Sequence, residues 1–231
     1  NVEIIISGGS LISASAINRT IPKDLVFSVG SIDFGTGTLN VSGTVTGSDI
    51  TGNATISDNT TLLIGNGTSG NTNAQTIAGN LTLNKLTIDK RNGTNAVDST
   101  VTLGNILAFT ANGTINVSHG ILDFNAPGAL AGSLSSLNLT IGSNGVLKTG
   151  GTTLTGITGT INTASGKIVF DGSEIETMPA WALSELEIDN SAGVVTSTGT
   201  MNVSQSLIMT NGIITTTATK ILQLGTAATV Q

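Results

Sequence analysis

Two stretches of the chain, residues 81–124 and 181–224, carry one pattern at an offset of one hundred positions without a gap. The residues that recur one hundred positions later are Leu83, Leu86, Ile88, Asp89, Gly93, Thr100, Thr110, Ile121 and Leu122. Elsewhere apolar residues replace one another, as where Leu103 matches Val203. Self-similarity at a fixed period indicates a repeat architecture, because structure holds the spacing while the sequence diverges.

Within these stretches, apolar and polar residues alternate in short runs. Leu86-Thr87-Ile88 and Val101-Thr102-Leu103 place apolar side chains on one face and polar side chains on the other. This alternation is typical of half-buried strands. Asn-Gly pairs such as Asn112-Gly113 separate the runs and tolerate the positive φ of tight corners. We therefore predict strands throughout and no amphipathic helix.

Short strands with glycine corners fit either an array of sandwiches or a β-solenoid. An immunoglobulin-like sandwich needs longer strands and aromatic side chains to fill its core, whereas only 3% of this chain is aromatic. A β-solenoid stacks small aliphatic side chains coil on coil, and Thr, Ser and Asn cover its outer faces. The sequence predicts one all-β domain, a parallel β-solenoid of the right-handed β-helix type, with roughly 20 residues per coil.

The repeat divides this solenoid into modules of about one hundred residues. The expected boundaries are 1–23 for the tail of one module, 24–124 and 125–224 for two modules, and 225–231 for the start of the next coil. The first boundary rests on Ile4-Ile5-Ile6-Ser7-Gly8-Gly9, which is similar to Leu207-Ile208-Met209-Thr210-Asn211-Gly212. The matched pairs expected to point inward are Leu86/Leu186, Ile88/Ile188 and Leu103/Val203.

Composition limits the classes of function. The chain has 231 residues, no Cys, one His, 10% charged residues and a net charge of −6. The lack of Cys excludes disulfides and thiolate metal sites, and the dispersed cations argue against nucleic acid as a partner. Every apolar run is shorter than the length of about 18 residues that a membrane-spanning helix needs. We expect no cofactor, no metal and no membrane insertion.

The densest acidic group is Asp171, Glu174 and Glu176. Two carboxylates that flank a sugar can act as acid and base, but no His or Arg lies near these three and the first repeat lacks them. We expect a solvated turn here and predict that the chain is not an enzyme. His119 stands alone, and Trp181 is expected to pack in a corner rather than stack on a sugar.

Asp89 and Asp189 are the one charge kept by both repeats. A catalytic residue is seldom needed twice at equal spacing, whereas an Asp that bonds backbone amides after a strand is needed in every copy. We therefore predict that both residues cap turns. A weak Ca²⁺ site is the alternative, and it would require more oxygen ligands than the neighbouring sequence offers.

The string Gln75-Thr76-Ile77-Ala78-Gly79, followed by Leu86-Thr87-Ile88-Asp89, resembles repeats in large surface and secreted proteins of Bacteroidetes and their relatives. The second copy keeps Glu176-Thr177-Met178 and Leu186-Glu187-Ile188-Asp189-Asn190. The resemblance covers most of the chain. It implies an exported protein similar to adhesins and cell-surface filaments.

Several residues are candidates for glycosylation. Asn66, Asn92 and Asn112 lie in Asn-X-Ser/Thr triplets at expected turns, where they would be accessible. Ser99 lies in Asp98-Ser99-Thr100, which resembles the short O-glycosylation motif of Bacteroidetes.

These observations favour an extracellular or cell-surface structural protein, a rigid stalk or a filament subunit. The alternatives are a surface that binds ice or glycans, suggested by Thr-rich runs such as Thr152-Thr153-Leu154-Thr155, and, least favoured, a polysaccharide lyase or hydrolase. The sequence shows no Thr-X-Thr column that persists. The runs Ile4-Ile5-Ile6 and Ile221-Leu222-Gln223-Leu224 near the two ends carry no polar cap. We expect each end to be covered by a second copy stacked end to end or by flanking domains of a longer chain.

Overall fold

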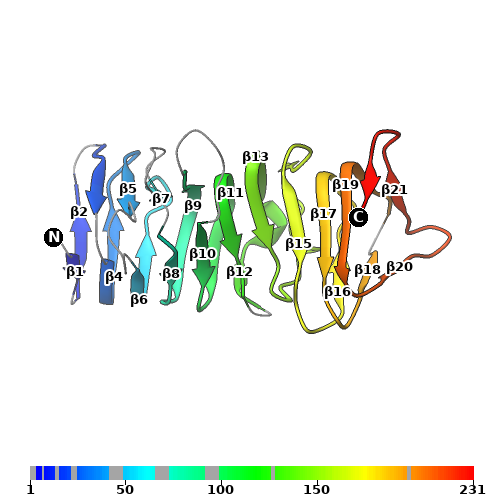
Figure 1. Ribbon diagram of the computed structural model, residues 1–231. Coiled ribbons are helices and arrows are strands. Elements are labelled where there is room, and N and C mark those ends of the chain that lie inside the picture. The colour runs from blue at the N-terminus through cyan, green and yellow to red at the C-terminus, as the bar shows by residue number, and fades with distance from the viewer. Residues whose placement is uncertain are drawn as a thin grey trace.

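The chain forms a parallel β-solenoid whose coils follow one another along a single axis (Figure 1). The computed structural model describes residues 4–6, 8–13, 16–21, 25–41, 49–65, 73–91, 99–125, 128–196 and 199–231. Every strand pairing among these residues is parallel, and one sheet connects 19 strands while a second connects three. The predicted fold class is therefore confirmed.

Each coil passes three faces, here named A, B and C in chain order. On face A each strand pairs with the next, beginning with β1 (Ile4–Ile6), the first parts of β4 (Leu25–Asp33) and β6 (Ile50–Ile56), β8 (Gln75–Ile77) and β10 (Thr100–Leu103). The face continues through the last parts of β11 (Leu107–Asp123) and β13 (Asn138–Lys148) and through β15 (Lys167–Phe170). It ends with the last part of β17 (Ala182–Asp189), the second part of β19 (Met201–Asn211) and β22 (Thr229–Val230).

Face B begins with β2 (Ser10–Ile12) and continues through the last parts of β4 and β6, the first part of β9 (Leu81–Asp89), the first part of β11 and β12 (Leu130–Gly132). A single turn of 3-10 helix, Leu134–Ser136, follows β12. In the last coils, the segment that follows face A forms instead a three-stranded sheet of β16 (Glu176–Met178), β18 (Val194–Thr196) and β20 (Ile214–Thr215).

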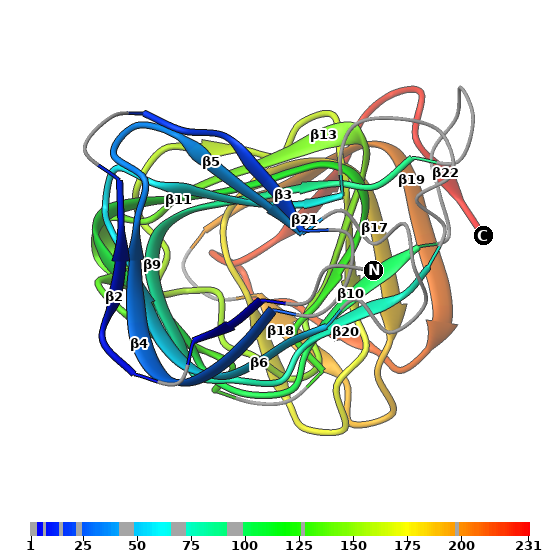
Figure 2. The same cartoon turned by 90° about the vertical axis from the view of Figure 1, so that its left-hand side faces the viewer.

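Face C consists of β3 (Arg19–Ile21), β5 (Thr38–Val41), β7 (Thr61–Gly65), the last part of β9, the middle of β11, the first part of β13 and β14 (Ile161–Asn162), and then the first parts of β17 and β19 and β21 (Leu222–Leu224). Seen from the N-terminal end, the chain turns clockwise as it recedes from the viewer through faces A, B and C (Figure 2). The solenoid is thus right-handed, as parallel crossover connections almost always are.

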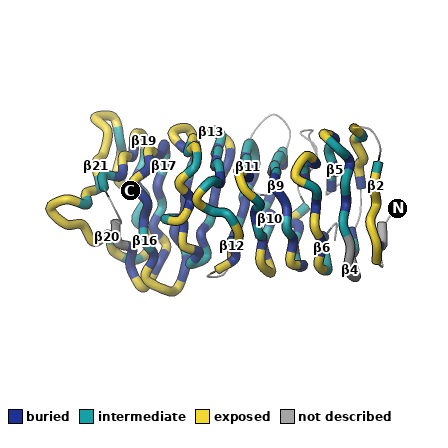
Figure 3. The backbone as a smooth tube through the Cα atoms, turned by 180° about the vertical axis from the view of Figure 1, so that it is seen from behind, coloured by how far each residue is buried: buried dark blue, intermediate teal, exposed yellow. Residues whose placement is uncertain are grey.

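The core consists of columns of aliphatic side chains that stack from coil to coil. One column on face A runs through Val101, Leu122, Leu147, Ile168, Leu186 and Leu207, all buried. Full burial of each such side chain contributes about 1.5–3 kcal/mol. Buried residues alternate with more exposed ones along the strands, and exposed residues gather at the corners and around β21 (Figure 3).

Side chains at the corners replace the hydrogen bonds that the strands no longer supply. Asn53 Oδ1 accepts the backbone N–H of Asn80 at 3.1 Å, and Asn80 Oδ1 accepts that of Ile106 at 3.2 Å. Each Asn therefore bonds the coil that follows its own, which links successive corners into a ladder. The same corner brings backbones very close, because a Cβ on Gly79 would lie 1.4 Å from the carbonyl oxygen of Gly52.

The repeat behaves differently from the predicted modules. Leu86 and Leu186 are both fully buried, as predicted. However, Leu86 pairs with Ile115 on face C, whereas Leu186 pairs with Ile168 on face A. Coil length varies around the expected length of roughly 20 residues, because paired residues lie 29 positions apart at Leu86 and Ile115 but only 18 apart at Lys167 and Glu185. One hundred residues therefore do not make a whole number of coils.

Candidate functional site

A buried carboxylate accepts hydrogen bonds from four donors. Glu176, only 4% exposed, lies at the start of β16. Its Oε1 accepts hydrogen bonds from the hydroxyl of Thr149 and from the N–H of Gly151, the latter at 3.2 Å. Its Oε2 accepts the N–H of Gly172 at 3.0 Å and Nδ2 of Asn190 at 2.5 Å. We name Thr149, Glu176, Asn190 and these two amides the Glu176 cluster.

The three carboxylates of the acidic group have separate environments. The expectation of a solvated turn was wrong for Glu176, which is buried because four donors from three coils replace its hydration. It was also wrong for Asp171, whose Oδ2 lies 2.8 Å from Lys148 Nζ and whose Oδ1 accepts the N–H of Gly150. Only Glu174 is exposed, as expected. The three carboxylates thus differ in burial and in partners.

The first repeat has a buried group at the matched position. Lys90 is fully buried, and its Nζ donates to the carbonyl of Asn73, which also accepts the hydroxyl of Ser99 at 2.9 Å. In the second repeat, Asn190 Nδ2 donates in the same way to the carbonyl of Glu174 at 2.8 Å. Both residues thus bond back to the carbonyl of a residue two positions before an earlier strand, β8 for Lys90 and β16 for Asn190. Burial lowers the pKa of Lys90 to about 8, although the charge of Asp49 opposes the shift.

The predicted turn cap at Asp89 stays a prediction, because residues 92–98 of the turn that follows lie outside the described residues. Asp89 Oδ1 lies 2.9 Å from His119 Nδ1 on the next coil and 3.0 Å from Nε of Arg91. The carboxylate of Asp189 is exposed, and within the described ranges its side chain caps no backbone amide. Asp89 thus contacts Arg91 on its own coil and His119 on the next coil. In the second repeat, Asn190, the residue after Asp189, caps the turn by accepting the N–H of Ala192 at 2.8 Å.

Other Asp residues do act as caps. Asp33 Oδ1 accepts the N–H of Gly35 at 2.9 Å, and Asp123 Oδ1 accepts that of Asn125 at 2.8 Å. Both bonds join a residue to the amide two positions on, the Asx-turn geometry. Asp caps of this kind therefore occur in the described residues at positions 33 and 123, which the repeat did not single out.

Charged side chains on the outside of face A are paired between coils. Lys167 Nζ lies 2.7 Å from Glu187 Oε2, and Glu187 Oε1 accepts the hydroxyl of Thr210 at 2.9 Å. Burial raises the pKa of Glu187, but the bonds from Lys167 and Thr210 outweigh it, so the net shift is downward. Lys148, paired with Asp171, has a raised pKa because that hydrogen bond favours its charged form despite partial burial. These pairs bridge successive coils.

The glycosylation candidates differ in accessibility. Asn66 and Asn92 lie outside the described residues. Asn112 is exposed at a corner with φ 58, and its N–H donates to the hydroxyl of Ser136 at 2.9 Å. Ser99 is only 3% exposed and its hydroxyl is hydrogen-bonded inward. In the folded chain the side chain of Asn112 is therefore accessible to solvent, whereas the hydroxyl of Ser99 is not.

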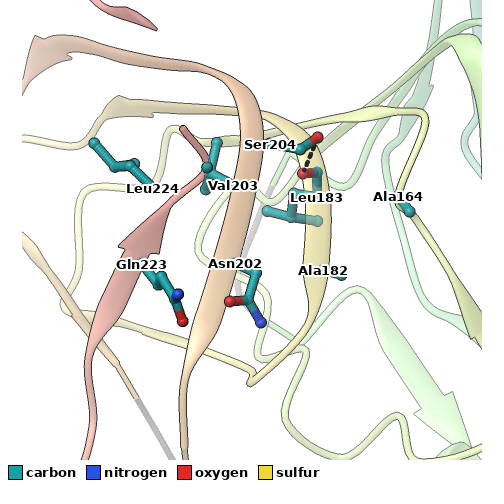
Figure 4. A pocket seen from close by; sticks show the side chains of 9 residues that line it. Ala164, Ala182, Leu183, Asn202, Val203, Ser204, Gln223 and Leu224 are labelled. Atoms are coloured by element: carbon teal, nitrogen blue, oxygen red, sulfur yellow. Dashed lines mark hydrogen bonds between the residues drawn. The ribbon is translucent and has the colours of Figure 1, made fainter. Parts of the chain in front are cut away.

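Two hollows lie towards the C-terminal half. Trp181 is 8% exposed and packs with the core, which supports the corner-packing prediction, and one edge of it lines a hollow of about 230 Å³ with Pro179 and Thr158. A hollow of about 150 Å³ lies where face C meets the last coil, between Leu183, Val203 and Leu224 (Figure 4). Leu183, Val203 and Leu224 occupy paired positions on three successive strands of face C.

Two polar ranks run along the outside of face C. The pairing registers place in one rank Thr38, Thr61, Lys85, Thr114 and Asn138, and in the other Thr20, Asn40, Leu63, Thr87, Asn116, Thr140 and Asn162. The ranks are interrupted by Lys85 and Leu63. The sequence did not reveal this array because the coil lengths that align it vary.

Comparisons with known proteins identify no relative. No protein-family model, no curated protein and no solved structure matches the chain. Among the described residues, no group of three or more His, Asp or Glu could hold a metal ion. The same part of the chain contains no helix of the length and hydrophobicity needed to cross a membrane.

Proposed function

We propose that the chain is a rigid structural spacer, a stalk of the kind found in surface proteins. The observation that carries the proposal is the unbroken series of parallel pairings on face A from β1 to β22. No domain boundary interrupts this series near residue 125, where Phe124 N–H donates to the carbonyl of Lys148 at 3.0 Å. A continuous ladder of this type resists bending at any one coil.

The corners support the same proposal. Asn53 and Asn80 bond from one coil to the next at one corner, and Asn138 Oδ1 accepts the N–H of Thr160 at 2.7 Å at another. Ion pairs such as Lys148–Asp171 add links on the outside of face A. Each coil is thus held at its faces and its corners, so its position relative to its neighbours is fixed. A spacer outside the cell or on its surface is what the resemblance to surface repeats implies.

Rigidity can be measured directly because the chain has no Cys. The variant with Thr20→Cys and Asn202→Cys places two spin labels on the outside of face C, on exposed positions of β3 and β19. Pulsed electron resonance should give one narrow distance distribution, set by about 4.8 Å per intervening coil. A broad or bimodal distribution, with each single-label variant as control, would contradict a rigid spacer.

The ranks on face C favour a second candidate function, a surface that orders water and binds ice. Hydroxyl and amide groups repeat at the coil spacing of about 4.8 Å in two parallel ranks. Thermal hysteresis measures this activity, and Thr140→Lys, in the middle of one rank, should abolish it. Thr55→Lys, exposed on face B, is the matched control. Absence of hysteresis in the unmodified chain would exclude this candidate and leave the spacer.

A further inference from the structure

Face B is interrupted inside the stack. Among the described residues, β12 pairs only with β11, and β16 pairs only with β18. Between these two strands along the axis, residues 149–160 form no strand and bend through turns, in which Ile157 N–H donates to the carbonyl of Leu154 at 3.0 Å. Paired strands lie about 4.8 Å apart and leave no room between coils, whereas turns fill their layer less evenly. The hollow of about 230 Å³ lies beside this segment.

Two successive coils form the walls of this hollow. The lining residues include Thr155, Thr158 and Ile161 from one coil and Pro179, Ala180 and Trp181 from the next. Apolar side chains and hydroxyl groups therefore both line the space, and none of the lining residues is charged. A charged ligand would lose its hydration here without gaining a counter-charge. The hollow therefore suits a small neutral ligand that combines an apolar surface with hydroxyl groups.

Trp181 brings a hydrogen-bond donor to this hollow. Its N–H donates to the carbonyl of Pro179 at 3.0 Å and its carbonyl accepts the N–H of Asn202 at 2.9 Å, so the residue is held in place by its own backbone. The side chain packs with the core and is 8% exposed, yet its Nε1 donates to no group among the described residues. The indole N–H of a buried Trp usually has a partner. Nε1 is also not one of the unpartnered polar atoms that the fold shuts off from solvent. The missing acceptor can therefore come from a ligand in the hollow.

The threonines of the opposite wall supply the complementary groups. Thr158 Oγ1 donates to the carbonyl of Ser135 at 2.8 Å, so its lone pairs remain free to accept a hydrogen bond. The hydroxyl of Thr155, which is half-buried, has no partner among the described residues and can donate or accept. The hydroxyl groups of a sugar donate and accept as well, and its C–H groups suit an apolar side chain.

We propose that this hollow binds one ring of a neutral sugar. Nε1 of Trp181 donates to a sugar hydroxyl, Thr155 and Thr158 bond others, and the C–H groups of the ring lie against Pro179 and Ile161. The volume is below the about 300 Å³ at which pockets for drug-sized ligands begin, which limits the ligand to a single ring. Trp181 uses its edge in this contact, so its packing in the corner is retained. The site is independent of the spacer function and adds a ligand to it.

The test uses the fluorescence of Trp181. The chain has one Trp and no Tyr, so its intrinsic emission reports on this side chain. The 231-residue chain is titrated with the methyl glycosides of glucose, galactose, mannose and N-acetylglucosamine. At least one should change the emission in a saturable way, with one site by calorimetry and a dissociation constant on the order of 1 mM. The uronate of the sugar that binds carries a negative charge and should bind more weakly.

Three variants locate the binding. Ala180→Phe, at an exposed position of the lining, fills the hollow and should abolish the signal. Thr155→Val removes one hydroxyl and should raise the dissociation constant about 2- to 10-fold. Thr153→Val is the matched control, because Thr153 is exposed two residues away and does not line the hollow. It should bind like the unmodified chain.

Three outcomes would overturn the inference: no saturable change with any of the four sugars, tighter binding of the uronate, or unchanged binding by folded Ala180→Phe. Circular dichroism and urea denaturation check the fold of each variant, and Ala180→Leu repeats the test if the Phe variant unfolds. The spin-label distances report rigidity separately, so a chain that binds no sugar can still be the proposed spacer.

Discussion

Asn190 Nδ2 donates to Glu176 Oε2 at 2.5 Å, and both side chains are withdrawn from solvent. The same amide group donates to the carbonyl of Glu174, and Asn190 Oδ1 accepts the N–H of Ala192. One residue therefore closes a coil, satisfies a buried carboxylate and caps the following turn. In the first repeat Lys90 performs only the first of these tasks.

Glu176→Gln should destabilise the fold. In Gln an NH₂ group takes the place of one carboxylate oxygen, so a donor replaces an acceptor. That donor must face the N–H of a Gly or the amide of Asn190, and these buried donors lose their acceptor. We expect the free energy of unfolding to fall by about 1–3 kcal/mol. Glu174→Gln, at an exposed position two residues away, is the matched control and should stay within about 0.5 kcal/mol. Urea denaturation of both variants measures the difference, and equal midpoints would contradict the role of Glu176.

Alternation in the sequence was sufficient to predict the strands and their inward residues. Leu86, Ile88, Leu186 and Ile188 are buried as predicted, because the side-chain period of a strand is two whatever the strand pairs with. The same pattern carries no information about which earlier residue a strand pairs with. That pairing depends on the length of each corner, and the corners vary enough to move Leu186 to another face from Leu86.

The buried polar residues were missed for a related reason. In the sequence Lys90 stands next to Arg91, and an adjacent pair of cations is expected to be exposed. Its burial depends on the carbonyl of Asn73, which lies at the start of the same coil. Asn190 reads as one of many Asn residues. Only the coil closure brings such partners together, although the shared position of Lys90 and Asn190, next to the repeated Asp, was an available signal.

Gly79→Ala should be strongly destabilising, while Gly104→Ala should be tolerated. A Cβ on Gly79 would lie 1.4 Å from the carbonyl oxygen of Gly52, and neither backbone can move without separating the coils. A Cβ on Gly104 would find its nearest atoms at 3.5 Å, an ordinary contact. Thermal unfolding of the two variants compares neighbouring glycines of similar corners. Similar melting temperatures would show that the coils at Gly52 and Gly79 are farther apart than described.

Glu187→Gln should lower stability at neutral pH and have little effect in acid. The pKa of Glu187 lies below its usual value because the bonds from Lys167 and Thr210 outweigh burial. A depressed pKa means that the charged carboxylate stabilises the fold above its unfolded pKa, and that this contribution is lost as pH falls through the folded value. The pair is partly exposed, so we expect at most about 1 kcal/mol. Denaturation at pH 7 and pH 3 gives the comparison; a difference that persists at pH 3 would rule out the ionised pair as its source.

Lys90 should make the stability of the fold rise in alkali. Burial lowers its pKa to about 8 from 10.5, so the folded chain releases this proton at a pH where the unfolded chain still binds it. The free energy of unfolding therefore increases with pH between these two values. Few other groups titrate in that range, because the chain has neither Tyr nor Cys.

The variant Lys90→Met isolates this contribution. Met keeps the length of the apolar stem without the charge. The carbonyl of Asn73 loses its hydrogen bond from Lys90 Nζ but still accepts the hydroxyl of Ser99. We expect the stability of the unmodified chain, relative to Lys90→Met, to improve steadily from pH 7.5 to pH 10, as followed by urea denaturation at each pH. Lys85→Met is the control, because Lys85 lies on the outside of face C and should show no such trend. Parallel curves for the unmodified chain and Lys90→Met would mean that Lys90 keeps its proton in the fold, through contact with water or a nearby anion.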